Sequence, residues 1–512
     1  MDTAPAAAPP AKTSHPLGFW FIFFGELAER CSFYGMRGLL AMYLIHVFGK
    51  TKGEASEVVH LYMAGCYLTG LLGGFVADRF LGKYWTIVLF SVPYVVGQCL
   101  IGLSDLTLVY TALVILAFGS GVIKPNISTL MGMTYDQQRP GQTLLRTKAF
   151  GYFYMAINVG SLLSYQIAPL IRDSFGKVDP ATNALADPKA GYLAGFLFPA
   201  VLMAVALVIF AVGKRFYATE TKAAAAEPDP TPTPAAEKWR IVWRLFGLFG
   251  LVLFFWMVFD QKATTWIYFA NDHLQLQFTL TSPVGFPDQN LTVGSWQVPL
   301  GWEAKDYRIP PESLASANPF FILCFVPLLN LLFGVLEKKG VRVRPTDKMI
   351  AGFLLTAGAC GIHAVTGTIA TNPDGSITRV PVAWQLAAYV VLTLGEVLIS
   401  VTGLELAYSA APKSMKSFIT ALWFVPIFVA NLLSSQLAKT YPDTKHVSPF
   451  GAVAGGMVGA DTGVVEVYRP WYQFPTAQGY FLFLTVLVLV VAVAFVFVAK
   501  RFNKANEASR VA

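Results

Sequence analysis

Residues 221–238 read TKAAAAEPDPTPTPAAEK, a run of Ala, Pro, Thr and charged residues without one large apolar side chain. Such a segment cannot cross a membrane and is typical of a disordered linker. The chain on either side of it is rich in apolar stretches of the roughly 20 residues that a membrane-spanning helix needs. Six of these precede the linker, at 19–47, 56–79, 84–103, 107–131, 147–170 and 191–214. Six follow it, at 242–271, 317–337, 349–370, 382–411, 417–437 and 478–500.

The composition points to the same fold class. Of the 512 residues, 55% are hydrophobic and 13% are charged, whereas about 25% of the residues of a soluble domain are charged. We therefore predict an all-α polytopic membrane protein with 12 transmembrane helices. The five cysteines lie in apolar stretches without paired spacing or a histidine cluster, which predicts neither a disulfide framework nor a metal site.

The net charge of +8 is concentrated in particular connections between the apolar stretches. Lys and Arg gather in alternate connections, for example at 79–83, 139–148 and 338–348, and short basic loops stay on the cytoplasmic side of a membrane. We therefore expect a multi-pass protein of a bacterial inner (plasma) membrane with both termini in the cytoplasm. The positive charge then reflects topology, and no nucleic-acid partner is expected.

The linker divides the chain into two halves with the same number of apolar stretches. We expect an N-terminal six-helix bundle at 19–215 and a C-terminal six-helix bundle at 239–502. The remaining segments are a cytoplasmic tail at 1–18, the cytoplasmic linker at 216–238 and a C-terminal tail at 503–512. Two such bundles resemble the major facilitator fold, in which the substrate site lies near the membrane midplane between the halves.

The first apolar stretch contains several charged residues, in the run GELAERCSFYGMRGLL at 25–40. Glu26, Arg30 and Arg37 are spaced i, i+4 and i+11, so they lie almost on one line of a helix, with Glu29 beside it. A charge inside a membrane is unfavourable unless it is paired or hydrated. The stripe could be an internal Glu–Arg pair that locks the fold, but so many ionisable groups favour a polar cavity.

Three other apolar stretches carry a buried charge, namely Lys124, Asp260 and Glu396. A helical rise of about 1.5 Å per residue places Arg37 and Asp260 at a similar depth near the periplasmic side, where they could form a latch between the halves. Arg30, Lys124 and Glu396 lie between the midplane and the inner third of the membrane by the same estimate. Two cations then face one anion across a cavity, an arrangement that suits a small zwitterion with its carboxylate at the cations.

Several motifs around these charges occur in order along the chain: ERCSFYG from Glu29, GVIKPNIS at 121–128, FGYFYMAINVGS at 150–161, FWMVFDQ at 255–261 and GEVLISVTGLELAYSAAP at 395–412. Together they resemble the motifs of the proton-dependent oligopeptide transporter (POT/PTR) family of the major facilitator superfamily. The run GGFVADRFLGK at 73–83 is similar to the general loop motif of that superfamily. The chain departs from the family pattern at Phe33, where a Tyr is usual, and many bacterial members have Glu in place of Asp260.

The resemblance implies a role for each matching residue. Arg30 and Lys124 would contact a peptide carboxylate, while Asn318 and Glu396 would hold the amino terminus. The pocket would be lined by Tyr34, Tyr67, Asn158, Trp256 and Trp423. Arg37 and Asp260 would form the outer gate, and Glu26, Glu29 and Asp260 would take part in proton coupling.

His60 lies seven residues before Tyr67 and therefore on nearly the same helix face. A histidine near a helix end is most often a hydrogen-bonded structural residue. The run HLYMAGCYLTG from His60 is nevertheless similar to mammalian peptide carriers, in which a histidine at this spacing is linked to proton coupling. We therefore interpret His60 as a proton-linked residue beside Arg37 and Asp260.

These observations predict a symporter that imports di- and tripeptides by alternating access, driven by the proton gradient and without a cofactor or metal. A transporter of the same fold for nitrate, amino acids or another small solute is the alternative, and a membrane receptor is a further one. An enzyme is not expected, because the chain has no GxSxG, no HExxH and no phosphate-binding loop. The expected partners are peptides, protons and the lipid bilayer.

Overall fold

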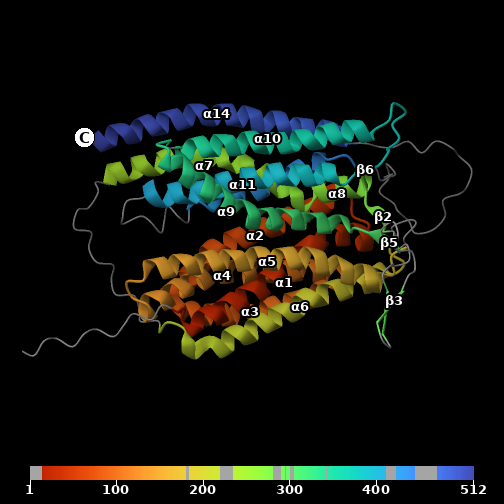
Figure 1. The fold of residues 1–512 in the computed structure, drawn as a ribbon, viewed down its shortest axis with the longest axis horizontal. Helices are drawn as coiled ribbons and strands as arrows, with labels where there is room; N and C mark the ends of the chain where they lie inside the picture. Colours follow the sequence, from red (N-terminus) through yellow and green to blue (C-terminus); the bar gives the residue numbers. More distant parts are fainter. Residues whose placement is uncertain are drawn as a thin grey trace, which may run out of the picture.

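The computed structural model describes residues 14–179, 184–219, 235–280, 290–293, 296–299, 305–341, 343–410, 422–443 and 470–511. Long helices run side by side along one axis (Figure 1). The first half contains α1 (Leu17–Phe48), α2 (Lys52–Val76), α3 (Lys83–Ile101), α4 (Leu106–Gln138), α5 (Thr143–Gly176) and α6 (Pro188–Val212). The second contains α7 (Ala235–Phe259), α8 (Thr265–His273), α9 (Ala317–Lys338), α10 (Pro345–Ala370), α11 (Ala383–Ala410), α13 (Val425–Leu437) and α14 (Ala477–Val511). Most of the predicted linker lies outside the described residues.

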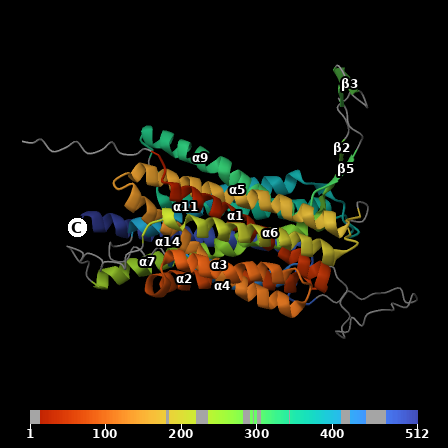
Figure 2. The ribbon, with the colours of Figure 1, turned by 90° about the horizontal axis from the view of Figure 1, so that it is seen from below.

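Helices of the two halves occupy different parts of the molecule. In Figure 1, α1 and α3–α6 lie in the lower part, and α7, α10, α11 and α14 lie in the upper part. Helix α2 packs against α13, and α5 packs against α9, so these pairs join the halves. Figure 2 shows α9 beside α5 at the edge of the molecule, and most of the apolar surface of α9 is exposed, as suits a helix that faces lipid.

Within the described residues, ten helices are long and apolar enough to cross a membrane. Helices α5 and α13 occupy the two remaining predicted positions. Residues 417–421 of the predicted eleventh span lie outside the described residues, and α13 itself has only 13 residues. A polytopic helical fold is therefore observed, while the number of 12 spans stays a prediction.

Short strands form small two-stranded sheets at one end of the bundle (Figure 1). Strand β1 (Leu274–Gln275) pairs in parallel with β6 (Val380–Pro381), with Leu274 opposite Val380. Strand β2 (Gln277–Leu280) pairs antiparallel with β5 (Lys305–Arg308), and β3 (Asn290–Val293) pairs antiparallel with β4 (Trp296–Pro299). All of these strands lie in connections between the predicted apolar stretches, and the sequence analysis did not predict them.

Local sequence explains where the helices near this end begin and stop. Helix α1 stops at Phe48, and Gly49 caps it. The φ of Gly49 is 65°, a left-handed backbone conformation that glycine adopts without steric cost. Thr51 and Glu54 then form a reciprocal capping box that starts α2. Earlier in α1, a Cβ at Gly160 of α5 would lie 2.7 Å from the backbone oxygen of Leu27, so only glycine lets the two helices approach this closely.

The predicted seventh span at 242–271 is not one continuous helix. Helix α7 ends at Phe259, a 3₁₀ turn covers Asp260–Ala263, and α8 resumes at Thr265 after the irregular backbone of Thr264. Broken helices at membrane depth are tolerated where their backbone is buried in protein or lines a cavity. The break places two charged side chains of the 3₁₀ turn, Asp260 and Lys262, inside the protein.

Candidate functional site

The charged stripe of α1 is buried in the N-terminal half. Arg30 Nε lies 2.9 Å from Glu26 Oε1 and 2.5 Å from Glu29 Oε2, and all three side chains are almost fully buried. The internal Glu–Arg pair considered from the sequence is therefore present, and it involves both carboxylates. Among the described residues, Arg30 Nη2 is buried without a hydrogen-bond partner. The two carboxylates therefore leave one nitrogen of the guanidinium group without an acceptor.

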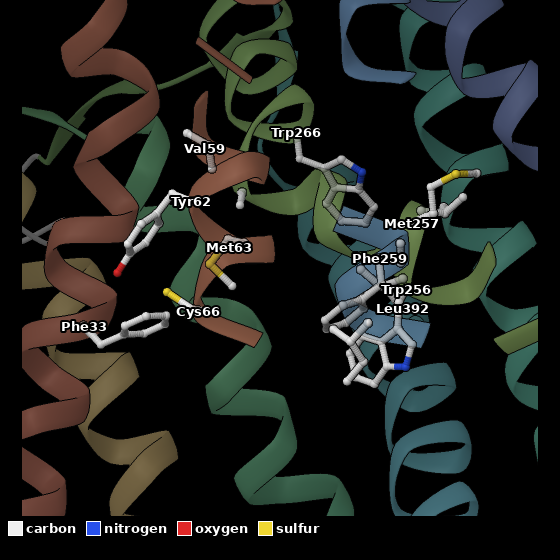
Figure 3. Close-up of a cluster of buried hydrophobic side chains, with 14 of the residues drawn as sticks. Phe33, Val59, Tyr62, Met63, Cys66, Trp256, Met257, Phe259, Trp266 and Leu392 are labelled. Carbon is white, nitrogen blue, oxygen red and sulfur yellow. The ribbon is translucent and has the colours of Figure 1, made fainter. Parts of the chain in front are cut away.

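Lys124 of α4 approaches the same region from the neighbouring helix. Its Nζ lies 4.1 Å from the centroid of the Phe33 ring and 5.6 Å from that of Tyr67. A cation over an aromatic face is attracted by the ring quadrupole. The departure from the family pattern at Phe33 thus removes a hydroxyl group but leaves an aromatic face for Lys124. Figure 3 shows Phe33 beside Tyr62 and Cys66 in this apolar surrounding.

A buried ion pair joins the two halves. Arg37 Nη2 of α1 donates to Asp260 Oδ1 of the 3₁₀ turn at 3.1 Å, and both side chains are buried. Asn431 Nδ2 of α13 donates to Asp260 Oδ2 at 2.9 Å. The structure therefore brings together the two residues that the sequence placed at one depth, and it adds Asn431, which the sequence analysis missed.

His60 is completely buried next to this pair. Its Nδ1 lies 3.3 Å from Asn431 Oδ1, and its Nε2 lies 3.2 Å from Thr264 Oγ1. His60 thus lies next to the pair of Arg37 and Asp260, where the sequence analysis placed it, and it is connected to Asp260 through the amide of Asn431. Neither Thr264 nor Asn431 carries a charge, so no hydropathy signal singles them out.

The C-terminal half contributes a second polar group. Lys262 Nζ donates to Asn318 Oδ1 at 2.6 Å, and Asn318 Nδ2 donates to Glu396 Oε2 at 2.6 Å. Asn318 Nδ2 also donates to Thr393 Oγ1 at 3.0 Å. The structure therefore places Asn318 beside Glu396, as the resemblance implies. It also reveals Lys262, which the sequence analysis passed over although it is a cation two residues after Asp260 in an apolar stretch.

The remaining pocket residues are distributed over several helices. Tyr34 packs edge-on against Phe33, with 5.2 Å between the ring centroids. Asn158 donates to the backbone oxygen of Tyr154 in its own helix. The two tryptophans are buried: a Cβ at Gly403 would lie 1.9 Å from the Trp423 ring, and Trp256 Nε1 has no hydrogen-bond partner among the described residues.

A cavity of about 1780 Å³ reaches this region from one end of the bundle. It is lined there by residues 77–85, which connect α2 to α3, and it extends inward to Tyr67 and Lys124. Leu404 and Phe424 line it from the C-terminal half. We call this end, which carries residues 77–85, the open end.

The opposite end, where α1 stops and α2 begins, is the closed end. Side chains of the two halves meet here in several ion pairs. Arg172 of α5 binds Glu312, Arg308 Nη1 lies 2.8 Å from Asp173 Oδ2, and Lys52 Nζ lies 2.5 Å from Asp272 Oδ2. Lys439 Nζ also lies 2.7 Å from Glu57 Oε1. The sequence analysis predicted none of these pairs.

The described residues contain no group of three or more His, Cys, Asp or Glu side chains that could hold a metal ion. The chemistry that this region offers is instead recognition of charge. Cations of the N-terminal half stand near the cavity, and the carboxylate of Glu396 stands in the C-terminal half.

Comparison with known proteins gives a consistent result. A sequence model described as the POT family matches residues 84–228 and 297–454, together more than half of the chain. Solute carrier family 15 member 1 of Rattus norvegicus is 28% identical over 425 residues, which are 72% of this chain and 55% of that protein. Peptide transporter 3 of Caenorhabditis elegans is 30% identical over 393 residues, which are 69% of this chain and 51% of that protein. The chain thus spans about half the length of these curated relatives.

Solved structures match over almost the whole chain. The crystal structure of the POT family transporter PepTSo is similar with a TM-score of 0.72 and 26% identity, covering 96% of this chain and 99% of that chain. A crystal structure of a peptide transporter POT in complex with alafosfalin is similar with a TM-score of 0.72 and 20% identity, covering 96% of each chain. These likenesses confirm the predicted polytopic helical fold of the major facilitator type, although not the number of spans, and the proteins matched are described as transporters rather than enzymes.

Proposed function

The chain belongs to the POT family, and on this premise we propose that it is a proton-coupled symporter that imports di- and tripeptides by alternating access. The observation that carries the proposal is the presence of charged side chains of opposite sign in the two halves. Lys124 reaches the cavity from the N-terminal half, and the anion Glu396 lies in the C-terminal half. A small zwitterion has the complementary pair of charges.

In this proposal the substrate bridges the two halves. Arg30 and Lys124 bind the peptide carboxylate, while Asn318 and Glu396 bind the terminal ammonium. The proposed lining residues are Tyr34, Tyr67, Asn158, Trp256 and Trp423. Arg30 Nη2 has no hydrogen-bond partner in the described part of the chain, which supports the first assignment, because a buried guanidinium nitrogen is unfavourable unless it finds an acceptor.

The proposed gate is the pair of Arg37 and Asp260. It connects the two halves on the closed-end side of the site, so it must separate before a peptide can enter from that end. The proposed proton-coupling residues are Glu26, Glu29, His60 and Asp260. His60 is suited to this role because the hydrogen bonds through Asn431 connect its ring to the gate carboxylate.

We further propose that the open end faces the cytoplasm of a bacterial inner membrane, with both termini on that side. The basic residues at 79–83, 139–148 and 338–348 support this orientation. Two six-helix bundles, at 19–215 and 239–502, are the proposed moving parts.

The test is uptake of radiolabelled dialanine into liposomes that contain the purified protein. We expect dialanine to accumulate above its external concentration with an inward proton gradient and only to equilibrate with that concentration after the gradient is collapsed. An excess of unlabelled tripeptide should compete, whereas a single amino acid or nitrate should not. Competition by nitrate or an amino acid alone would instead favour a transporter of another small solute.

A matched variant tests the charge assignment in the same assay. Glu396→Ala removes the proposed anchor of the ammonium group, and loss of one partner of a buried charge pair weakens binding strongly. We expect dialanine uptake to fall to background while the variant reaches the membrane and elutes as a single peak. Uptake at the level of the unaltered protein would contradict the assignment.

A further inference from the structure

Among the described residues, Lys262 is a buried charged residue that the proposed function above does not use. It lies in the 3₁₀ turn that interrupts the seventh span, and its side chain is 8% exposed. Burying an ammonium group is unfavourable unless nearby groups replace its hydration. The contacts of Lys262 therefore show which groups of the site favour an ammonium ion.

Three kinds of group surround the Lys262 ammonium. Asn318 Oδ1 accepts its hydrogen bond at 2.6 Å, and the Phe259 ring centroid lies 3.4 Å from Nζ. The carboxylate of Glu396 follows one hydrogen bond further on, through Asn318 Nδ2. An amide oxygen, an aromatic face and a nearby carboxylate are together the groups that a primary ammonium ion needs. Figure 3 shows Phe259 in a wall with Trp256 and Leu392, which limits access of water.

Glu396 is the available counter-ion for this cation. Asp260 is nearer in sequence, but it already accepts hydrogen bonds from Arg37 and Asn431. The Lys262–Asn318–Glu396 chain therefore pairs one cation with one anion within the C-terminal half. A peptide ammonium that arrived at Asn318 and Glu396 would meet a site already occupied by the same chemical group.

We propose that Lys262 is a tethered competitor for the substrate ammonium, holding Asn318 and Glu396 while the cavity is empty and leaving them when a peptide amino terminus binds. This inference rests on the proposed function. It makes Lys262 a determinant of specificity, because a free amino terminus must displace a cation and gains correspondingly less affinity. A peptide with a blocked amino terminus leaves Lys262 in place and avoids that exchange.

The inference predicts a ratio of two dissociation constants, that of N-acetyl-dialanine divided by that of dialanine. Removing one partner of a buried charged hydrogen bond usually weakens binding by at least about thirtyfold. With Lys262 present we expect the ratio to stay below about thirtyfold, because the lysine pairs with the anion whenever the peptide does not. Without a cation at residue 262, the protein should show its full preference for dialanine over N-acetyl-dialanine, and the ratio should exceed about thirtyfold.

The experiment measures both constants by isothermal titration calorimetry at one pH on the purified full chain and on three variants. Lys262→Gln and Lys262→Met are neutral and close in length, and Lys262→Arg keeps the charge. We expect both neutral variants to bind dialanine more tightly and to raise the ratio, while Lys262→Arg keeps the ratio of the unaltered protein. Combining Lys262→Gln with Glu396→Gln should lower the ratio again, because the anion is then absent.

Each outcome decides one point. A ratio already above about thirtyfold in the unaltered protein, or one that fails to rise in whichever neutral variant elutes as a single peak, overturns the competitor role of Lys262. Equal weakening of both ligands in Lys262→Gln means that the lysine only supports the local structure, which also overturns it. Failure of the unaltered protein to bind dialanine at all would instead refute the proposed function.

Discussion

The closed end and the open end of the molecule differ in what lies between the two halves. At the closed end the halves meet through ion pairs, among them those of Arg37 with Asp260 and Arg172 with Glu312. At the open end a cavity of about 1780 Å³ runs inward from residues 77–85. In this structure the molecule is therefore open at one end and held together by ion pairs at the other.

The polar character of the closed end has a further consequence. Separating an apolar interface costs about 25 cal/mol for each Å² that becomes exposed. Separated ion pairs, in contrast, regain hydration, and a buried pair often contributes little net stability over its solvated partners. An end closed by ion pairs can therefore reopen at modest cost, while a change in one partner alone is strongly unfavourable to the closed form.

The largest expected effect comes from the central pair. Asp260→Ala leaves Arg37 buried without its counter-ion, which should destabilise the closed form by roughly 3 kcal/mol, or more than about 100-fold. The reporter is Ser56→Cys, a buried residue of the closed end that donates to Tyr268, in a chain whose native cysteines are replaced. We expect its reaction with a membrane-impermeant maleimide to accelerate by about two orders of magnitude.

The matched control for this variant removes both charges at once. Arg37→Ala combined with Asp260→Ala leaves no buried charge unpaired, so the acceleration should be clearly smaller than for Asp260→Ala alone. Labelling that stays within about twofold of the reference in Asp260→Ala would show that the pair does not hold the closed end.

A smaller effect is expected from the outer pair of Arg172 and Glu312. Both side chains are at most 1% exposed, but Arg172 keeps a second carboxylate, because its Nη2 lies 2.6 Å from Asp173 Oδ1. Glu312→Gln should therefore accelerate labelling of the same cysteine by about tenfold. If Glu312→Gln accelerates labelling as much as Asp260→Ala does, Asp173 does not compensate for the lost charge of Glu312.

His60 tests the coupling of the closed end to protons. His60→Gln keeps a hydrogen-bonding side chain, and loss of neutral hydrogen bonds to Asn431 and Thr264 should change labelling only severalfold. Proton-driven accumulation of dialanine should nevertheless be lost, while counterflow, which needs no net proton movement, should continue. Accumulation that still responds to pH in this variant would transfer the role to Glu26 and Glu29.

The smallest effect is expected from a peripheral pair of the closed end. Lys439 and Glu57 are each about 30% exposed, and such pairs contribute about 0–1 kcal/mol. Lys439→Ala should therefore change cysteine labelling by less than about fivefold, and added salt should reduce even that difference. A change as large as that from Glu312→Gln would mean that depth of burial does not rank these contacts.

The sequence predicted those parts of the fold and site that depend on hydropathy and on charge in apolar stretches. Counting helical rise placed Arg37 and Asp260 at one depth, and the structure shows their side chains in contact. The resemblance placed Asn318 beside Glu396, and the two are hydrogen-bonded. The first prediction succeeded because a buried charge is costly enough to be visible in sequence alone, whereas the second came from the resemblance to the family.

The sequence could not predict what depends on irregular backbone and uncharged partners. The break at Asp260–Ala263 lies in an apolar run that reads as a continuous helix, and Lys262 faces Asn318 only because of that break. Asn431 links His60 to Asp260, yet an asparagine in a helix has many possible partners. The partner of Arg172 lies in a connecting segment, at Glu312, whose position relative to α5 no periodicity fixes.

The alternation of the two ends is the central claim, and spin-label distance measurements test it most directly. One pair of labels replaces the exposed residues Ser174 and Arg379 at the closed end, and a second replaces the exposed residues Thr143 and Lys339 at the open end. With saturating dialanine at acidic pH, we expect longer distances at the closed end and shorter distances at the open end, in matching fractions of molecules. Closed-end distances that do not change while dialanine binds, or distances that lengthen at both ends together, would contradict the account.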